Sequence, residues 1–171
     1  MTQKLNYTVF ETPTGWMGIL GSEKGLLRTT LPRRSTRDVE RILDKNLING
    51  ATCSSQPFTE LVERFQLYFR GQKVTFPDPL DLSIATSFQR RVWAAARLIP
   101  YGETRSYAWI AKQIKSPAAA RAVGQALGAN PLPIIIPCHR VLSSNGGLGG
   151  FGGGLKLKRR LLKLEGNQNI P

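Results

Sequence analysis

The residues best suited to covalent chemistry in this sequence are Cys138 and its neighbour His139. A thiolate is a strong nucleophile, whereas a thiol with an ordinary pKa of about 8.5 is a weak one at neutral pH. A base or a positive charge nearby would lower that pKa, and His139 is the only histidine of the chain. Cys138 is therefore the best candidate nucleophile. The dipeptide alone also fits a buried, inert cysteine, because side chains that are adjacent in sequence need not face each other.

Few other residues of the chain could form disulfides or bind a metal ion. The chain has 171 residues, two cysteines and one histidine. Two cysteines are too few for a disulfide framework, so we expect free thiols. A structural zinc site usually takes four Cys or His ligands, so no metal site is predicted. Cys53 has no histidine or cationic neighbour close in sequence and is interpreted as a bystander.

The charge of the chain is unevenly distributed. The formal net charge is +13 and the pI is about 10.5. Up to Ala85 there are 11 Lys and Arg against nine Asp and Glu, whereas the remainder has 13 against only Glu103 and Glu165. A strongly basic lobe favours a polyanionic partner, most commonly nucleic acid, although a general charge bias is the alternative. No apolar run suits a membrane helix, and the N-terminus lacks a signal-peptide stretch, so a cytoplasmic protein is expected.

The first lobe is predicted to combine an antiparallel meander with helices. Apolar runs separated by turn residues indicate strands at 7–10, 16–20 and 26–31, and helical periodicity follows at 35–43 and 58–69. Ser35 and Asp38 are typical of a helix start. Phe76–Pro79 is interpreted as a linker, which gives domains at 1–80 and 81–171.

The second lobe is predicted to be mostly helical. Helices are expected at 88–98, at 106–114, and from Ser116-Pro117 to about Leu127, where a serine N-cap precedes a proline. The last two resemble a helix-turn-helix unit. Asn130–Pro133 should form a rigid turn, and Ile134–Ile136 a short buried strand.

The last of these three helices carries almost only small side chains. Its single guanidinium, Arg121, stands among alanines and glycines, whereas a helix that reads base edges in the major groove carries several Arg, Asn or Gln residues. Small side chains favour close backbone approach in a minor groove. A helix buried tightly in the core is the alternative.

Several ordered blocks in the second lobe point to one family. They are Pro100-Tyr101-Gly102-Glu103, Ser106-Tyr107, Ala119–Gly124, Asn130-Pro131, Ile136–Val141, Gly153-Gly154-Leu155 and Leu164-Glu165-Gly166. On these blocks the sequence resembles the O6-alkylguanine-DNA alkyltransferases, also called methylated-DNA–protein-cysteine methyltransferases. The resemblance covers residues 88–166, and the first lobe matches only in length and strand-then-helix order. It implies a mixed α/β (α+β) fold with an RNase H-like N-terminal lobe and a winged-helix-like C-terminal lobe containing the helix-turn-helix.

The resemblance implies direct-reversal DNA repair by a single-turnover methyltransferase. In this family the cysteine takes the alkyl group from guanine O6, or from thymine O4, in one irreversible step after the damaged base has flipped out. Cys138 would be the acceptor, His139 the base acting through a water, and Glu165 the group that orients His139. Tyr107 would protonate the leaving guanine, and Asn130 would tie the turn to the site. No cofactor is implied.

The resemblance also implies roles in binding. Arg121 would fill the gap left by the flipped nucleotide in double-stranded DNA, with Ala120, Ala122, Gly124, Ser106 and Tyr107 in the minor-groove surface. Pocket residues would be Arg140, Val141, Phe151, Gly152 and Lys158. Relatives often carry Tyr and Ser where this chain has Phe151 and Gly152, which predicts a looser wall that tolerates bulkier alkyl groups. A monomer with no membrane partner is expected.

One alternative concerns the role of Lys158, and two concern the function of the protein. Lys158 lies in the basic run Lys156–Arg160, which favours contact with solvent or phosphate over a place at the site. A non-catalytic damage-recognition module of the same fold is the second alternative, although such proteins lack the acceptor cysteine. The third is a helix-turn-helix transcription factor with a structural Cys138, which predicts sequence-specific DNA binding.

Overall fold

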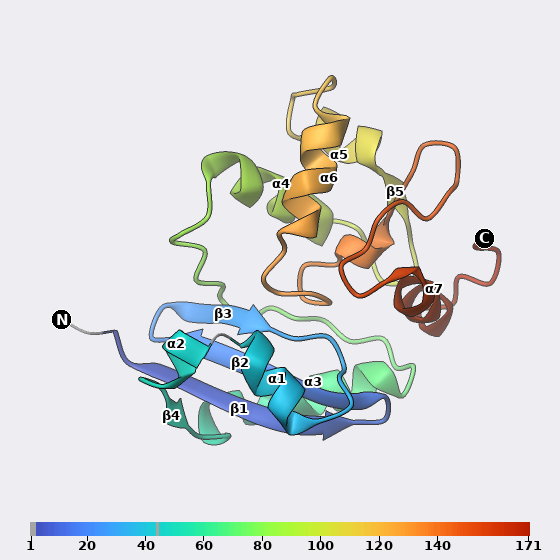
Figure 1. Ribbon diagram of the computed structural model, residues 1–171. Helices are drawn as coiled ribbons and strands as arrows, with labels where there is room; N and C mark the ends of the chain where they lie inside the picture. Colours follow the sequence, from blue (N-terminus) through green and yellow to red (C-terminus); the bar gives the residue numbers. More distant parts are fainter. Residues whose placement is uncertain (1–2, 44) are drawn as a thin grey trace. The chain divides into compact units, whose positions relative to one another are not determined.

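A computed structural model of the chain describes residues 3–43 and 45–171 and divides into two compact units, Met1–Ser83 and Ile84–Pro171 (Figure 1). The domain boundary placed after residue 80 lies close to this division and stays a prediction. Within the described residues, no helix combines the length and the apolar character needed to cross a membrane. Each unit is described separately below.

The first unit is built on a four-stranded sheet with the order β3-β2-β1-β4. β1 (Leu5–Thr12), β2 (Gly15–Ser22) and β3 (Gly25–Thr29) form the antiparallel meander that the sequence predicts, with the turn at 13–14. β4 (Thr52–Cys53) adds a short parallel strand beside β1, which the sequence pattern did not indicate. Two residues are too few for a recognisable alternation of apolar and polar side chains.

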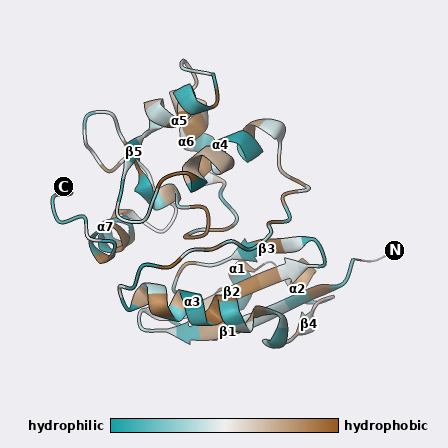
Figure 2. Cartoon of the chain, turned by 180° about the vertical axis from the view of Figure 1, so that it is seen from behind, coloured by the Kyte–Doolittle hydropathy of each residue, from teal (hydrophilic) through white to brown (hydrophobic). Residues whose placement is uncertain are grey.

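Helices cover both faces of this sheet (Figures 1 and 2). Successive side chains of a strand point to opposite faces, so each strand contributes to two layers. Leu20 lies on one face in a cluster with Val39 and Leu43, while Phe10 packs against Phe65 on the other, with ring centroids 5.8 Å apart. The brown colour of β2 in Figure 2 reflects this burial on both sides.

The two helices predicted in the first unit begin within a residue of their expected starts, and α2 was not predicted. α1 (Thr36–Ile42) is capped by Ser35, whose hydroxyl accepts from the Asp38 amide at 3.2 Å. α2 (Lys45–Ile48) follows it, and the short 3-10 turn η1 (Gln56–Phe58) leads into α3 (Thr59–Phe69).

The segment Phe76–Pro79 is part of the first unit, which corrects its interpretation as a linker. Phe76 packs on Phe65 at 5.0 Å between centroids, and Asp78 accepts two hydrogen bonds from the Arg64 guanidinium. The following Asp81 is held by Ser22 and Ser83. Burial by itself would raise the pKa of Asp81, but these hydrogen bonds lower it to about 2. Proline-rich composition suggested a linker, but side-chain contacts distant in sequence tie the segment down.

The second unit holds four helices and one small sheet within its described residues. The helices are α4 (Ser87–Arg97), α5 (Tyr107–Gln113), α6 (Ala120–Gly128) and α7 (Leu155–Leu164). β5 (Arg105–Ser106) pairs in parallel with β6 (Val141–Leu142), and the 3-10 turn η2 (Cys138–Arg140) leads into β6. α4 and α5 match the predicted helices to within a residue.

The start of α6 differs from the prediction, because Ser116 ends α5 instead of capping the next helix. Lys115 adopts a left-handed φ of 57°, and the Ser116 amide donates to the Ala111 carbonyl at 2.9 Å. The Ser116 carbonyl then accepts from the Ala119 amide in a turn, and the helix begins at Ala120. This C-terminal capping motif satisfies carbonyls of α5 that the sequence pattern did not reveal.

Candidate active site

The loop that carries Cys138 is organised by the side chain of Asn130. Its amide Nδ2 donates to the Ile136 carbonyl at 2.8 Å and to Cys138 Sγ at 3.2 Å, while its Oδ1 accepts from the Leu132 amide at 2.9 Å. One side chain thus closes the turn and contacts the thiol. Asn130 is placed as the sequence analysis expects, with the contact to sulfur in addition.

The run Ile134–Ile136 is buried but forms a turn, which corrects the predicted strand. The Ile136 amide donates to the Leu132 carbonyl at 2.8 Å, and Ile134 has a left-handed φ of 75°. A β-branched residue in this region is a conformational outlier that costs about 1–3 kcal/mol. The turn is imposed by the prolines at 131 and 133 and by the Asn130 contacts. The apolar composition of Ile134–Ile136 therefore indicates that the segment is buried, but it does not indicate a strand.

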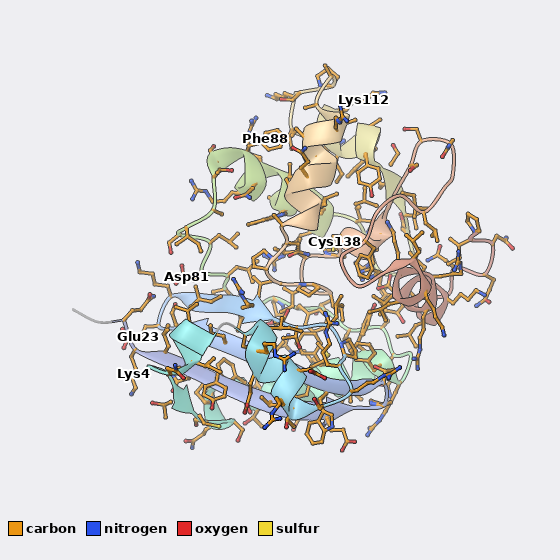
Figure 3. All side chains as sticks on the ribbon, viewed as in Figure 1. Lys4, Glu23, Asp81, Phe88, Lys112 and Cys138 are labelled. Carbon is orange, nitrogen blue, oxygen red and sulfur yellow. The ribbon has the colours of Figure 1, made fainter. Side chains whose placement is uncertain are left out.

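Cys138 begins η2 and borders a cavity in the second unit. In Figure 3 it is labelled within the second unit, whereas Lys112 lies at the edge of that unit. Burial raises the pKa of the Cys138 thiol, and the Asn130 hydrogen bond and the Lys158 charge oppose this shift without reversing it. The resting side chain is therefore a neutral thiol that needs a proton acceptor to become reactive.

Glu165 joins the histidine and the arginine of the Cys-His-Arg segment. His139 Nε2 lies 2.7 Å from Glu165 Oε1, and the Arg140 guanidinium donates to both carboxylate oxygens at 2.8 and 3.0 Å. Gly102 also donates its amide to the carboxylate. Arg140 is further fixed by the Ile99 carbonyl at 2.8 Å. Two segments of the chain, at 139–140 and at Gly102, thus converge on one buried carboxylate.

The protonation states in this buried cluster follow from its contacts. Burial alone would raise the pKa of Glu165, but hydrogen bonds and charge from His139 and Arg140 lower it to about 2, so the carboxylate is ionised. Burial lowers the pKa of His139, although Glu165 opposes this shift. The imidazole is therefore neutral at pH 7 and can accept a proton, and the neighbouring carboxylate stabilises the imidazolium that forms.

The cavity beside the thiol has a volume of about 640 Å³ and is lined by α6, the segment after β6 and the glycine-rich loop of residues 146–154. We call it the Cys138 pocket. Its lining residues are Tyr107, Ala120, Arg121, Gly124, Gln125, Leu127, Gly128, Cys138, Ser143, Ser144, Gly149, Gly150, Phe151 and Gly152. Such a volume suits a small planar ligand, with the sulfur at its surface.

Tyr107 connects α5 to the glycine-rich loop. Its hydroxyl lies 3.5 Å from the Gly150 carbonyl, and burial together with the Cys138 charge raises the pKa of this phenol. Gly149 has a φ of 68°, and a Cβ at this position would lie 2.6 Å from the tyrosine hydroxyl. Only glycine fits this close approach. The phenol thus remains a proton donor at neutral pH, facing the pocket.

Lys158 supports the pocket wall from behind, which corrects its interpretation as a surface lysine. Its side chain is fully buried, and its ammonium donates to the carbonyls of Val141, Leu148 and Gly150 at 2.6, 2.5 and 3.2 Å. Burial lowers its pKa to about 8. Three N–H donors meet three backbone acceptors, so the helix α7 is tied to the loop that lines the pocket.

α6 presents its small residues and Arg121 outward. Arg121 and Ala122 are exposed, Ala120 and Gly124 are half-buried, and Val123 is buried on the opposite side. The Trp93 indole donates to the Ala126 carbonyl at 2.8 Å and fixes this helix on α4. The alternative of a fully buried small-residue helix is therefore wrong for this face.

Two family models match the chain and together cover most of it. Residues 87–167 match the DNA binding domain of 6-O-methylguanine DNA methyltransferase, and residues 5–82 match its ribonuclease-like domain. The chain belongs to the 6-O-methylguanine DNA methyltransferase family. The predicted family and the predicted two-lobed mixed fold are confirmed.

Relatives across bacteria and archaea support this membership. The methylated-DNA–protein-cysteine methyltransferase of Mycobacterium bovis is 55% identical over 161 residues, which span 94% of this chain and 92% of the relative. The protein of that name from Methanosarcina acetivorans is 41% identical over 94% of this chain and 98% of its own length. The crystal structure of Mycobacterium tuberculosis OGT in complex with DNA superposes with a TM-score of 0.79 at 40% identity, over 97% and 95% of the two chains.

Only some of the residues to which the resemblance assigns roles line the Cys138 pocket. Cys138, Tyr107, Arg121, Ala120, Gly124, Phe151 and Gly152 line the Cys138 pocket, whereas Ala122 and Ser106 do not. Ser106 caps α5 by accepting from the Trp109 amide at 3.0 Å. Arg140, Val141 and Lys158 also do not line the pocket, because Arg140 is held by Glu165 and Lys158 donates to the Val141 carbonyl. Whether Phe151 and Gly152 widen the range of alkyl groups stays a prediction.

Outside the glycine-rich loop, sequence reasoning missed five members of the pocket. Ser143 and Ser144 follow β6, and Gln125, Leu127 and Gly128 lie on α6. The helical spacing of Arg121, Gln125 and Gly128 could have indicated that they share one face. Nothing in the local sequence places the two serines at the pocket.

Proposed function

We propose that this protein repairs DNA by direct reversal, moving an alkyl group from O6-alkylguanine to its own Cys138. Membership in the family and its DNA-bound relative support duplex DNA as the partner. The observation that carries the proposal is the thiol of Cys138 at a pocket, contacted by Asn130 and followed by a His139–Glu165 pair. O4-alkylthymine would be a second substrate.

The first step activates the thiol. The Cys138 proton passes through a water to His139, and Glu165 stabilises the resulting imidazolium. That water would meet Nδ1 of the ring, because Nε2 is engaged with Glu165. The Asn130 amide and the Lys158 charge stabilise the thiolate as it forms. The raised resting pKa keeps the sulfur unreactive until this relay operates.

The second step is an in-line displacement. The thiolate forms a bond to the alkyl carbon while the bond from that carbon to guanine O6 breaks. The departing guanine takes a proton from the Tyr107 hydroxyl, whose raised pKa keeps it protonated beforehand. The Tyr107 phenolate then regains a proton through solvent while His139 releases the one that it took from Cys138. The products are S-alkylated Cys138 and an unmodified guanine. Nothing hydrolyses a thioether under these conditions, so each molecule reacts once.

Access to the pocket requires the damaged nucleotide to leave the duplex. Flipping costs a few kcal/mol of unstacking, and an inserted side chain can offset part of it. Arg121 is exposed at the pocket rim and suits this role, while the small residues around it allow close approach to the minor groove. A monomeric state, cytoplasmic residence and independence of a cofactor stay predictions from the sequence.

Intact-protein mass spectrometry after incubation with an O6-methylguanine duplex tests this proposal. We expect each molecule to gain one methyl in place of one hydrogen, mapped to Cys138 and absent in Cys138→Ser. Cys53→Ser is the matched control and should react like the wild type, because Cys53 is exposed on the first unit. DNA binding without a mass gain would instead support a damage-recognition module and overturn the repair activity.

A further inference from the structure

Helix α7 carries a stripe of cations that the site does not use. Lys156, Arg160 and Lys163 are exposed, and their spacing of four and three residues places them on one face of the helix. We call these three residues the α7 stripe. The opposite face is buried through Leu161 and Leu162, with the Lys158 amine turned inward.

Within the second unit, whose residues the structure describes throughout, no acidic side chain pairs with this stripe. The second unit has only two acidic side chains, and Glu103 pairs with Arg105 at 2.6 Å while Glu165 is committed to His139 and Arg140. Arg159, next to the stripe, donates to the Pro171 carbonyl and adds another positive charge. Like charges three and four residues apart on a helix repel each other. The helix therefore carries repulsion that an anionic partner would relieve.

The chemistry of the helix favours a phosphate backbone over a lipid surface. An interfacial membrane helix inserts an apolar face between lipid chains, opposite its cations. In α7 that face is already occupied, because Leu161 and Leu162 are in the core of the unit. A row of phosphates needs only exposed cations, which α7 offers.

The position of the stripe relates it to the pocket. Phe151 and Gly152 line the pocket wall, and Lys156 follows four residues after Gly152. A chain of that length spans at most about 14 Å. From Lys156 to Lys163 the helix rises about 10 Å, and one DNA strand carries a charge roughly every 3.4 Å along the duplex axis. The stripe can thus follow two or three consecutive phosphates beside a base held in the pocket.

We propose that the α7 stripe is a second DNA contact surface, which binds the sugar-phosphate backbone flanking the lesion. It acts in addition to α6 and carries no sequence preference, because phosphates are identical along the strand. The inference rests on the proposed function in so far as the duplex in question is the one whose base enters the Cys138 pocket.

Salt dependence of binding to undamaged duplex tests the stripe. Each phosphate contact contributes about 0.9 to the slope of log K against log salt. The triple variant K156Q/R160Q/K163Q should therefore lose about two to three units of slope and bind more weakly at low salt. The matched control K4Q/K24Q/K73Q removes the same charge from exposed lysines of the first unit and should keep the slope. K156R/R160K/K163R keeps the charge and should also retain it.

The outcomes separate this inference from the repair activity. Methyl transfer from the free O6-methylguanine base should be equal in the glutamine variant and the wild type, which also shows that the variant is folded. A slope that falls equally in both glutamine triples would reduce the stripe to a general charge effect and overturn the proposal. So would an unchanged slope with lost binding to phosphatidylserine vesicles. A wild type that binds DNA but gains no mass overturns the repair activity and leaves the slope comparison intact.

Discussion

At the scale of single residues, burial holds the proposed nucleophile Cys138 in its unreactive form and the proposed base His139 in its proton-accepting form. Burial raises the pKa of Cys138 and lowers the pKa of His139, so the resting pair is a thiol beside a neutral imidazole. Of Cys138, His139 and Glu165, only Glu165 is ionised in advance, because Arg140 and His139 supply its hydrogen bonds. A reactive thiolate forms only when a proton is relayed, which suits a protein that can react once.

Replacing Lys158 with methionine tests how much the pocket wall depends on its ammonium. Lys158→Met leaves the carbonyls of Val141, Leu148 and Gly150 without these donors, and a buried unpaired carbonyl costs about 1–3 kcal/mol. We expect single-turnover methyl transfer to slow by about tenfold or more, with little change in affinity for undamaged duplex. Lys112→Met, at an exposed position of α5 outside the α7 stripe, should transfer at the wild-type rate. Equal rates in both variants would mean that the wall holds without the ammonium.

At the scale of elements, the second unit presents α6 by fixing both of its ends. Trp93 of α4 donates to a carbonyl near the C-terminal end of α6, and the capped end of α5 leads into the turn before Ala120. The loop after α6 then carries Cys138, so the outward face of the helix and the thiol border one pocket. Recognition and chemistry are therefore built on adjoining segments of the chain.

Replacing Arg121 with alanine tests whether this helix assists base flipping. Arg121→Ala should slow repair of duplex DNA by roughly 10–100-fold, because an unfilled stack costs a few kcal/mol. Transfer from the free base should be unchanged, since no flipping is involved. Lys112→Ala removes an equal charge from α5 and should affect neither reaction (Figure 3). Equal losses on duplex and free base would identify Arg121 as structural. Rapid-quench assays on both substrates give the comparison.

At the scale of the whole molecule, stability depends on keeping ionised carboxylates buried. Asp81 in the first unit and Glu165 in the second both have a pKa of about 2, below their ordinary values of 3.8 and 4.5. A carboxyl whose pKa is lower in the folded state stabilises the protein above its unfolded pKa. That stabilisation is lost as the pH falls from the unfolded value to the folded one. The lowered pKa of His139 acts in the same direction below pH 6.5.

The free energy of unfolding, measured as the pH is lowered, should show the contributions of Asp81, Glu165 and His139. The free energy of unfolding should fall as the pH drops below about 6.5, with about 3 kcal/mol lost through Glu165 between pH 4.5 and 2. Glu165→Gln should be less stable at pH 7 and show a shallower decline, while Glu103→Gln should follow the wild type. Urea denaturation at several pH values measures this. Parallel acid limbs in all three proteins would contradict the assignment.

Local chemistry predicted most elements correctly because their start signals are local. Ser35 caps α1 as predicted, the helix expected at 106–114 forms as α5, and the meander follows from short apolar runs between turns. Predictions failed where another contact competed for the same group. Ser116 was a good N-cap by type, but its amide and carbonyl close α5 and the following turn. Ile134–Ile136 had strand composition, but Asn130 and two prolines impose a turn.

The sequence by itself determined the uneven charge and, through its motif blocks, the family, and it predicted Cys138 as the nucleophile. These depend on residue type and order, which need no fold to be read. Only the tertiary structure decided that Lys158 points inward to three carbonyls and that Ser143 and Ser144 border the pocket. The tertiary structure also shows that the Arg140 guanidinium donates to the carboxylate of Glu165, 25 residues away in the sequence. A buried polar group must find partners wherever the fold supplies them, and neither helical nor strand periodicity encodes where those partners are.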